Sequence, residues 1–183
     1  MISHRNVIAN VLQIGEFEAT YRDSLKAPGS QTAHTEVSLC LLPQSHIYCL
    51  VVICHSSPFR GDQAVVLPKF DLSSYLASIQ NFKISALFLV SNVSPHTKII
   101  MTRTHWLFFQ VPPIIIGMLR NHETCSKYDL SSIRSLFTGA APLGVETAED
   151  FQKLYPNVIV RQGYGEHSFG ILYYLILIVS RSD

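Results

Sequence analysis

Residues 128–143 read YDLSSIRSLFTGAAPL, and this stretch decides the fold class. The apolar run from Ile133 to Phe137 predicts a buried strand, and the small residues of 138–142 predict a tight exit loop. A helical pattern follows from Pro142 to Tyr155, and a second strand is expected at 158–160. The side chains expected to face inward from this helix are Leu143, Thr147, Phe151 and Leu154. A strand, a crossover helix and a strand form a βαβ unit, so the stretch predicts parallel strand pairing.

The rest of the chain repeats this alternation of apolar runs and amphipathic segments. Helices are expected at 4–21, 45–54, 71–81 and 112–121, and strands at 37–42, 64–67 and 84–90. Ser3 and Asp71 are of residue types that cap helices, and a break is expected at 56–58, where two serines precede a proline. The fold class is therefore α/β, a mostly parallel sheet covered by helices.

Composition and charge exclude several classes of protein. The chain has 183 residues, 48% of them hydrophobic and 15% charged, which is typical of a globular domain with a substantial core. The net charge is +1 without a run of like charge, so no nucleic-acid partner is expected. The longest apolar run, 171–179, is too short for a membrane-spanning helix, which needs about 20 residues. Without a signal-peptide pattern at the N-terminus we expect a cytoplasmic protein, and no specific protein partner is evident.

The four cysteines do not form a metal-binding pattern. Cys40, Cys49, Cys54 and Cys125 contain no CxxC pair and no Cys/His cluster with zinc spacing, so free thiols in a reducing compartment are expected. The chain also lacks a GxSxG nucleophile elbow and an HExxH zinc motif. No catalytic residue and no metal ligand is predicted, and hydrolase and metalloprotease functions are unsupported.

Two loops of small residues follow predicted strands, where ligands of parallel α/β sheets bind. The first loop, 138–142, holds a glycine and two alanines that would let a ligand approach the backbone closely. In the second, 162–165, Tyr164 stands between two glycines, and a planar base could stack on its ring. Each motif alone fits a simple strand-exit turn equally well, whereas the ordered pair favours a ligand site.

Two polar side chains outside these loops are ambiguous. His46 is a candidate general base or pocket wall, but a histidine beside Ile47 and Leu50 also fits a packed, hydrogen-bonded residue. Lys69 fits either a solvated surface lysine or a phosphate contact. Neither residue decides a function by itself.

Four ordered blocks of the sequence carry a family resemblance: 3–6 (SHRN), 42–69, 128–143 (YDLSSIRSLFTGAAPL) and 162–165 (QGYG). They resemble the adenylate-forming acid–CoA ligases, nearest the 4-coumarate:CoA ligase and acyl-CoA synthetase branch. The resemblance implies an incomplete part of the large N-terminal domain of an adenylate-forming enzyme. In such enzymes a carboxylic acid joins ATP with release of pyrophosphate, and the acyl group then passes from AMP to coenzyme A. Magnesium assists the first step.

Carried over residue by residue, the resemblance implies a set of site residues. Implied substrate-binding residues are His46, Tyr48, Ala140 and Ala141. Implied cofactor-binding residues are Lys69, Gly139, Gln162, Gly163, Tyr164 and Gly165. In these roles His46 and Tyr48 would shape the acid pocket. Lys69 would contact coenzyme A, and Tyr164 would lie against the adenine of ATP or AMP. The implied partners are therefore a small-molecule carboxylic acid and a nucleotide.

The chain also departs from the family pattern. The family continues GYG with a hydrophobic residue, a threonine and a glutamate that serves magnesium, whereas this chain reads Glu166, His167 and Ser168, so the magnesium ligand is expected to be lost. The glycine-rich phosphate loop that precedes 3–6 in the family and the C-terminal catalytic lysine have no counterpart. We therefore expect a truncated ligase that is inactive by itself.

The same resemblance predicts the domain organisation. Residues 1–165 are expected to be a partial AMP-binding domain with an atypical insertion at 91–110, because joining Val90 to Val111 restores a family-like segment. Residues 166–183 are expected to be a non-homologous apolar tail, and both stretches are candidates for translated intron. A non-catalytic AMP- or acyl-binding module is the alternative function. An unrelated Rossmann-like nucleotide binder is disfavoured because no GxGxxG is present.

Overall fold

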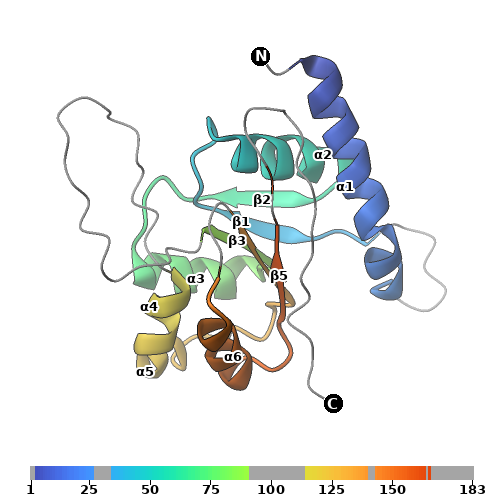
Figure 1. Cartoon of the computed structure of the whole chain (residues 1–183). Coiled ribbons are helices and arrows are strands. Elements are labelled where there is room, and N and C mark those ends of the chain that lie inside the picture. Colours follow the sequence, from blue (N-terminus) through green and yellow to red (C-terminus); the bar gives the residue numbers. More distant parts are fainter. Residues whose placement is uncertain (1–2, 27–33, 91–113, 140–142, 164, 166–183) are drawn as a thin grey trace.

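The computed structural model of the chain describes residues 3–26, 34–90, 114–139, 143–163 and 165. Its centre is one sheet of five strands in the order β2-β1-β3-β4-β5 (Figure 1). The strands are β1 Val37–Cys40, β2 Gln63–Val66, β3 Ala86–Val90, β4 Ser135–Gly139 and β5 Ile159–Gln162. Each neighbouring pair runs parallel, so the predicted α/β class with a mostly parallel sheet is confirmed.

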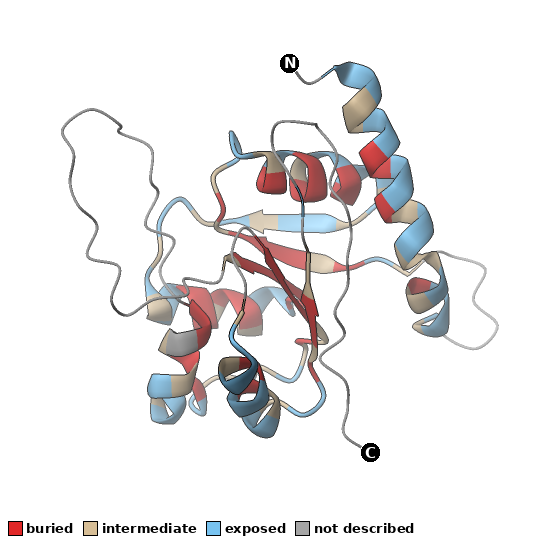
Figure 2. Cartoon of the chain, viewed as in Figure 1, coloured by how far each residue is buried: buried red, intermediate tan, exposed pale blue. Residues whose placement is uncertain are grey.

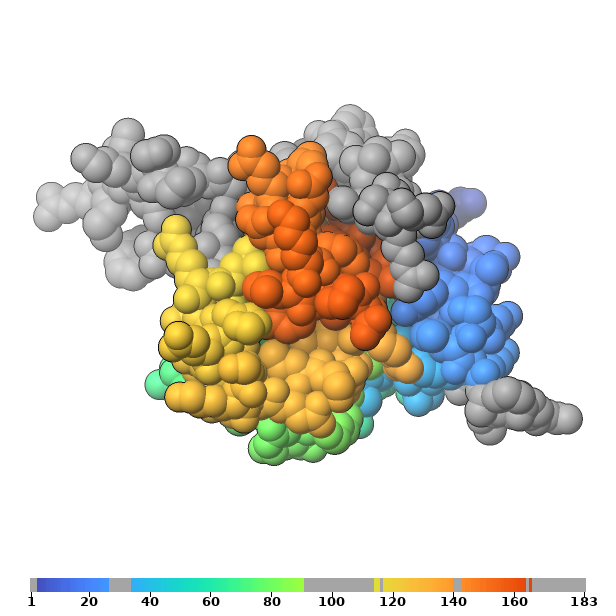
Figure 3. Space-filling model, turned by 90° about the horizontal axis from the view of Figure 1, so that it is seen from below, coloured from blue at the N-terminus to red at the C-terminus, as the bar shows by residue number. Residues whose placement is uncertain are grey.

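Helices cover both faces of this sheet. They are α1 His4–Ser24, the π-helix η1 Tyr48–His55, α2 Ser56–Arg60, α3 Leu72–Phe82, α4 Ile114–Arg120, α5 His122–Cys125 and α6 Val145–Leu154. Figure 1 shows α2 on one side of the sheet and α3, α4, α5 and α6 on the other. Seen from below in Figure 3, the green, yellow and orange surfaces of this second group adjoin one another.

The order of the strands in the sheet changes direction at β1, and this change indicates where a ligand would bind. The chain leaves β1 through η1 and α2 to reach β2, then returns through α3 to β3 on the other side of β1. A reversal of this kind opens a crevice at the carboxyl ends of the strands, where ligands of such sheets bind. The carboxyl edge of β1, β3, β4 and β5 is therefore the place to look for a ligand site.

The central strand β3 separates two apolar cores. Leu87 and Leu89 pack into one core with α3, α4 and α6, while Ala86 and Phe88 face α1 and η1. Successive side chains of a strand point to opposite faces, so a strand covered on both sides must be apolar throughout. Figure 2 shows the result as a buried sheet centre with exposed outer helix faces.

The predicted capping residues begin their helices as expected. The Ser3 side chain accepts a hydrogen bond from the Asn6 backbone N–H at 3.2 Å at the start of α1. The Asp71 carboxylate accepts one from the Ser74 backbone N–H at 2.8 Å at the start of α3. Each cap satisfies a backbone donor that has no partner within the helix.

The predicted helix break at 56–58 is wrong. The chain continues from η1 directly into α2, and the Ser56 hydroxyl donates to the Val51 carbonyl at 2.9 Å across the junction. Pro58 is the third residue of α2, inside this continuous helical segment. The helix ends instead at Gly61, whose positive φ of 75° is an arrangement that glycine adopts without strain.

The inward face of α6 also differs from the prediction. Phe151 is fully buried as expected, but Ala148 is the other buried residue of this helix, and Leu154 is 40% exposed. Leu154 is the last residue of this helix, which begins at Val145. The sequence pattern overweighted the large leucine and passed over the small alanine at the contact.

Candidate active site at the carboxyl edge

The carboxyl ends of β4 and β5 bring three of the predicted site residues together: Tyr48, Gly139 and Gly163. The Tyr48 hydroxyl donates to the Phe137 carbonyl at 3.0 Å, and the two ring centroids lie 5.9 Å apart. The Gly163 N–H donates to the Thr138 carbonyl at 2.8 Å, which continues the β4–β5 ladder past the end of the strand. An aromatic wall and two glycines therefore meet at one point of the sheet edge.

Close neighbours require a glycine at 163 but not at 139. A Cβ atom at Gly163 would lie 2.5 Å from Cζ of Phe137, a distance that real side chains do not tolerate. A Cβ atom at Gly139 would lie 3.6 Å from the Tyr48 ring and 3.6 Å from the Gly163 carbonyl oxygen, which is ordinary contact. Packing against Phe137 therefore requires glycine at 163, whereas a Cβ atom at 139 would fit beside the Tyr48 ring.

The loop after β1 and the start of η1 position Tyr48. The Tyr48 backbone N–H donates to Nδ1 of His46 at 3.2 Å, so the imidazole caps the first turn of the helix. Tyr48 is buried, with 5% of its surface exposed, while His46 is exposed. Both candidates for the acid pocket, His46 and Tyr48, lie on the segment between β1 and the first turn of η1. His46 accepts a hydrogen bond there and is not packed in the core.

Lys69 lies apart from this group. It follows β2, an outer strand of the sheet, and three strand steps separate β2 from β4. With neighbouring strands about 4.8 Å apart, the backbones are roughly 14 Å from one another across the sheet. The Lys69 ammonium is exposed, and its charge helps to lower the pKa of Asp71, after the larger effect of the Ser74 hydrogen bonds.

Several predicted site residues cannot be placed. Ala140, Ala141 and Tyr164 lie outside the described residues, as do the positions 166–168 on which the magnesium expectation depends. The insertion at 91–110 and the tail at 166–183 lie outside them as well, so these predictions stay predictions. Gln162 is half-buried at the end of β5 and Gly165 is exposed.

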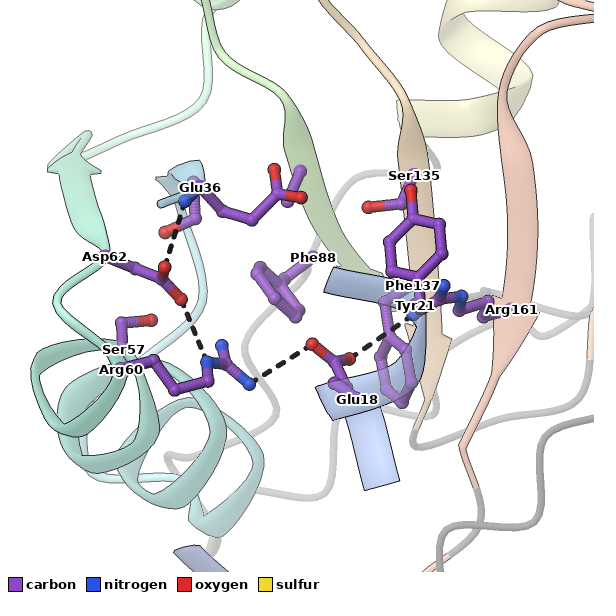
Figure 4. A pocket seen from close by; sticks show the side chains of 12 residues that line it. Glu18, Tyr21, Glu36, Ser57, Arg60, Asp62, Phe88, Ser135, Phe137 and Arg161 are labelled. Carbon is purple, nitrogen blue, oxygen red and sulfur yellow. Dashed lines mark hydrogen bonds and ion pairs between the residues drawn. The ribbon is translucent and has the colours of Figure 1, made fainter. Parts of the chain in front are cut away.

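Sequence reasoning missed a second polar group at the amino ends of the strands, which we call the amino-edge cluster. It consists of Glu18, Arg22, Glu36, Arg60, Asp62 and Arg161, and Figure 4 shows all of these except Arg22. Asp62 pairs with Arg22 at 2.6 Å and with Arg60 at 2.9 Å, and Glu18 bridges from Arg60 to Arg161 at 3.3 and 3.4 Å.

The ion pairs connect α1 to the start of β2 at one edge of the sheet and to β5 at the other, and their side chains are nearly buried. The Asp62 side chain is 1% exposed, and the arginine side chains of its two ion pairs are 9% and 8% exposed. The Arg161 guanidinium also lies 4.0 Å from the centroid of the Tyr21 ring, and burial raises the pKa of the Tyr21 hydroxyl. The signal that could have revealed the cluster is Arg161, a charged residue within the buried strand β5.

The described residues offer neither a metal cluster nor a membrane span. Within them no group of three or more His, Cys, Asp or Glu side chains is arranged to hold a metal ion. None of the described helices is long and apolar enough to cross a membrane.

With this geometry in place, comparison with known proteins identifies the family. The family model described as AMP-binding enzyme matches residues 1–166. The chain belongs to the AMP-binding enzyme family. The resemblance in its four sequence blocks is confirmed, and the carboxyl edge of β4 and β5 lies within the matched range.

Relatives in this AMP-binding family include acyl-CoA ligases and 4-coumarate–CoA ligases. The chain is 36% identical over 165 residues to acyl-CoA ligase lcsD of Purpureocillium lilacinum, a match that covers 90% of this chain and 35% of the relative. It is 32% identical over 165 residues to 4-coumarate–CoA ligase 1 of Arabidopsis thaliana, covering 90% of this chain and 24% of the relative. The chain thus spans about a quarter to a third of the length of these relatives.

Solved structures agree on the fold. ATP-bound MatB from Rhodopseudomonas palustris matches 90% of this chain and 25% of its own length, with a TM-score of 0.61 and 21% identity. The N-terminal domain of FACL13 from Mycobacterium tuberculosis matches 79% of this chain and 31% of its own length, with a TM-score of 0.54 and 21% identity. The sheet is therefore that of the N-terminal domain of adenylate-forming enzymes, as the sequence predicted.

Proposed function

We propose that this chain supplies the acyl- and adenylate-binding edge of an AMP-forming acid–CoA ligase. The observation that carries the proposal is the meeting of Tyr48, Gly139 and Gly163 at the carboxyl ends of β4 and β5. An aromatic ring fixed by a 3.0 Å hydrogen bond to the Phe137 carbonyl forms a rigid apolar wall. Gly139 lies within contact distance of that wall and of the Gly163 carbonyl, so the end of β4 joins the ring and the second loop.

The reaction proposed for the whole ligase has two steps. A carboxylate oxygen of the acid attacks the α-phosphorus of ATP and pyrophosphate leaves. The thiol of coenzyme A then attacks the acyl carbonyl, the thiol proton is lost, and AMP leaves. The residues of this chain contribute by holding the acyl group and the adenylate in line, which converts an encounter between molecules into a step within one complex.

Individual roles are those that the family resemblance implies. Tyr48 and His46 would border the acid, because they lie on the segment that leaves β1 beside the sheet edge. Gln162, Gly163 and Tyr164 would hold the adenylate. Ala140 and Ala141, after Gly139, would line the site of the nucleotide and the acyl group. Lys69, roughly 14 Å away across the sheet, is suited to a long ligand such as coenzyme A and not to the adenylate itself.

Calorimetric titration of the full 183-residue chain with AMP tests the proposal. We expect saturable AMP binding that Tyr164→Ala abolishes, because a stacked ring is the main adenine contact proposed. Phe59→Ala is the matched control, since it removes an aromatic ring that is 58% exposed on α2 and plays no part in the proposed site. Equal AMP affinity in the wild type and in Tyr164→Ala would show that the site is misplaced.

A second titration tests the proposed role of Lys69. We expect Lys69→Ala to weaken the binding of coenzyme A and to leave AMP affinity unchanged. If the substitution affects both ligands equally, or neither, the separate coenzyme A role of Lys69 is wrong.

A further inference from the structure

Two thiols lie in contact between the sheet and the π-helix. Sγ of Cys40, the last residue of β1, is 3.2 Å from Sγ of Cys49, the second residue of η1. Both side chains belong to the core cluster of this face, and at most 1% of either residue is exposed. Neither cysteine is part of the AMP-binding site proposed above.

The contact is close to the geometry of a covalent bond. A disulfide has an S–S distance of about 2.05 Å, so the two sulfur atoms need to approach by roughly 1.2 Å. Cys40 is held by ladder pairing of β1 with β2, whereas Cys49 lies in the first turn of a helix with wide i→i+5 turns. A small shift of this first turn of η1 would bring the Cys49 sulfur to the Cys40 sulfur and leave the pairing of β1 intact.

We propose that Cys40 and Cys49 form a redox-sensitive pair that a peroxide or a low-molecular-weight disulfide converts to a Cys40–Cys49 disulfide. With hydrogen peroxide, one thiolate attacks an oxygen and becomes a sulfenic acid as the O–O bond breaks. The second thiol then attacks that sulfur, the S–S bond forms and water leaves. Overall the two thiols lose two hydrogens and one peroxide becomes two waters, so atoms and electrons balance.

A third thiol gives the pair a path to solvent. Cys54 lies five residues after Cys49 in η1, which is the hydrogen-bonding interval of a π-helix, and it adds to the effects that raise the pKa of the Cys49 thiol. Unlike the other two, Cys54 is half-buried and reaches the surface. An oxidised glutathione molecule can therefore react first at Cys54 and leave a mixed disulfide there. The Cys49 thiol then attacks the Cys54 sulfur and releases glutathione, and the Cys40 thiol attacks the Cys49 sulfur and releases Cys54.

The reaction is expected to depend on pH. The hydrogen bond between the two thiols lowers the pKa of Cys40 and raises the pKa of Cys49, which burial raises further, so Cys40 is the thiol of the pair that ionises first and Cys49 keeps its proton. Because thiolates are the reacting form, the oxidation rate of the pair should increase as pH rises.

Oxidation would act on the segment that carries Tyr48. The disulfide would tie η1 to β1 at the residue next to Tyr48, whose hydroxyl contacts the Phe137 carbonyl. It closes a short loop of the chain, 40–49, and so restricts the unfolded state. The melting temperature of the oxidised protein should therefore rise by several degrees.

Mass spectrometry of the native wild-type chain tests the pair without any substitution. The chain is treated with hydrogen peroxide or oxidised glutathione at pH 8, alkylated in denaturant and digested with chymotrypsin. This protease cleaves after Leu41 or Tyr48 and after Leu50, which places Cys40, Cys49 and Cys54 on separate peptides. We expect a linked pair of the Cys40 and Cys49 peptides, about 2 Da lighter than the sum of the two thiol peptides, with Cys54 and Cys125 alkylated.

The other outcomes overturn the proposal. A stable Cys49–Cys54 link in its place, or four alkylated cysteines after treatment at pH 8 and at pH 9, would show that the contact does not react. In Cys40→Ala the exchange should stop at a Cys49–Cys54 link, whereas in Cys54→Ser the Cys40–Cys49 link should still form, but more slowly. Oxidation of the chain in denaturant is the control. The unfolded chain should pair its four cysteines without a preference for the Cys40–Cys49 link. All readouts are independent of AMP binding, so the pair stands or falls separately from the proposed function.

Discussion

Gly163 tests the packing on which the carboxyl edge depends. In Gly163→Ala the added Cβ would lie 2.5 Å from Cζ and 2.9 Å from Cε1 of Phe137. The Phe137 ring cannot move aside freely, because it is 6% exposed and lies 5.9 Å, centroid to centroid, from the rings of both Tyr48 and Phe88. Overpacking of a tight core costs about 1–3 kcal/mol, and we expect the free energy of unfolding to fall by that amount.

Urea unfolding followed by far-UV circular dichroism measures this effect. For a chain of this size the loss corresponds to roughly 2–4 °C of melting temperature per kcal/mol. Gly117→Ala is the matched control, because nothing lies within 4 Å of its Cβ in the middle of α4. Alanine in a helix should stabilise it by about 0.5–1 kcal/mol. If Gly163→Ala is as stable as the wild type, the close approach of Gly163 to Phe137 is wrong.

Three other substitutions test separate parts of the structure. Tyr48→Phe keeps the ring but removes the hydrogen bond to the Phe137 carbonyl, so urea unfolding should show a loss of about 0.5–1.5 kcal/mol, and no loss would contradict that bond. Asp62→Ala removes the carboxylate of the nearly buried Arg22 and one of the two carboxylates of Arg60, and should cost about 3–5 kcal/mol, whereas a cost under about 1 kcal/mol would mean that the amino-edge cluster is hydrated. Asp71→Asn retains the α3 cap but removes its charge. Hydrogen bonds from Ser74 lower the pKa of Asp71, so the wild type should be the more stable protein above about pH 4 and lose that advantage as the pH falls further. A difference that does not change between pH 7 and pH 2 would refute the cap.

The elements that sequence predicted best are those with strong local signals. Helix α1 begins at the residue after Ser3 and α3 at the residue after Asp71, because a capping side chain fixes a helix start locally. The strand at 84–90 was predicted because a strand buried on both faces must be apolar along its length. Its observed form, β3 Ala86–Val90, lies within the predicted range.

The failures arise where tertiary contacts outweigh local signals. Nothing local shows that 56–58 continues a helix, since the junction depends on i→i+5 turns and on the Ser56 hydroxyl bond to Val51. Similarly, Phe137 was predicted as a strand residue, but its role as the neighbour of Tyr48 and Gly163 depends on three segments far apart in the sequence. The resemblance supplied Tyr48, Gly139 and Gly163 as site residues, and only the parallel sheet explains why they meet.

Titration of the isotope-labelled full-length chain with AMP, followed by amide NMR, tests the central claim most directly. At the AMP concentration that saturates calorimetric binding, we expect the amides of Gly139 and Gly163 to shift. The amides of Glu36 and Asp62, at the opposite edge of the sheet, should remain in place. Unchanged signals from Gly139 and Gly163, or changes confined to the amino-edge cluster, would contradict a nucleotide site at the carboxyl ends of β4 and β5.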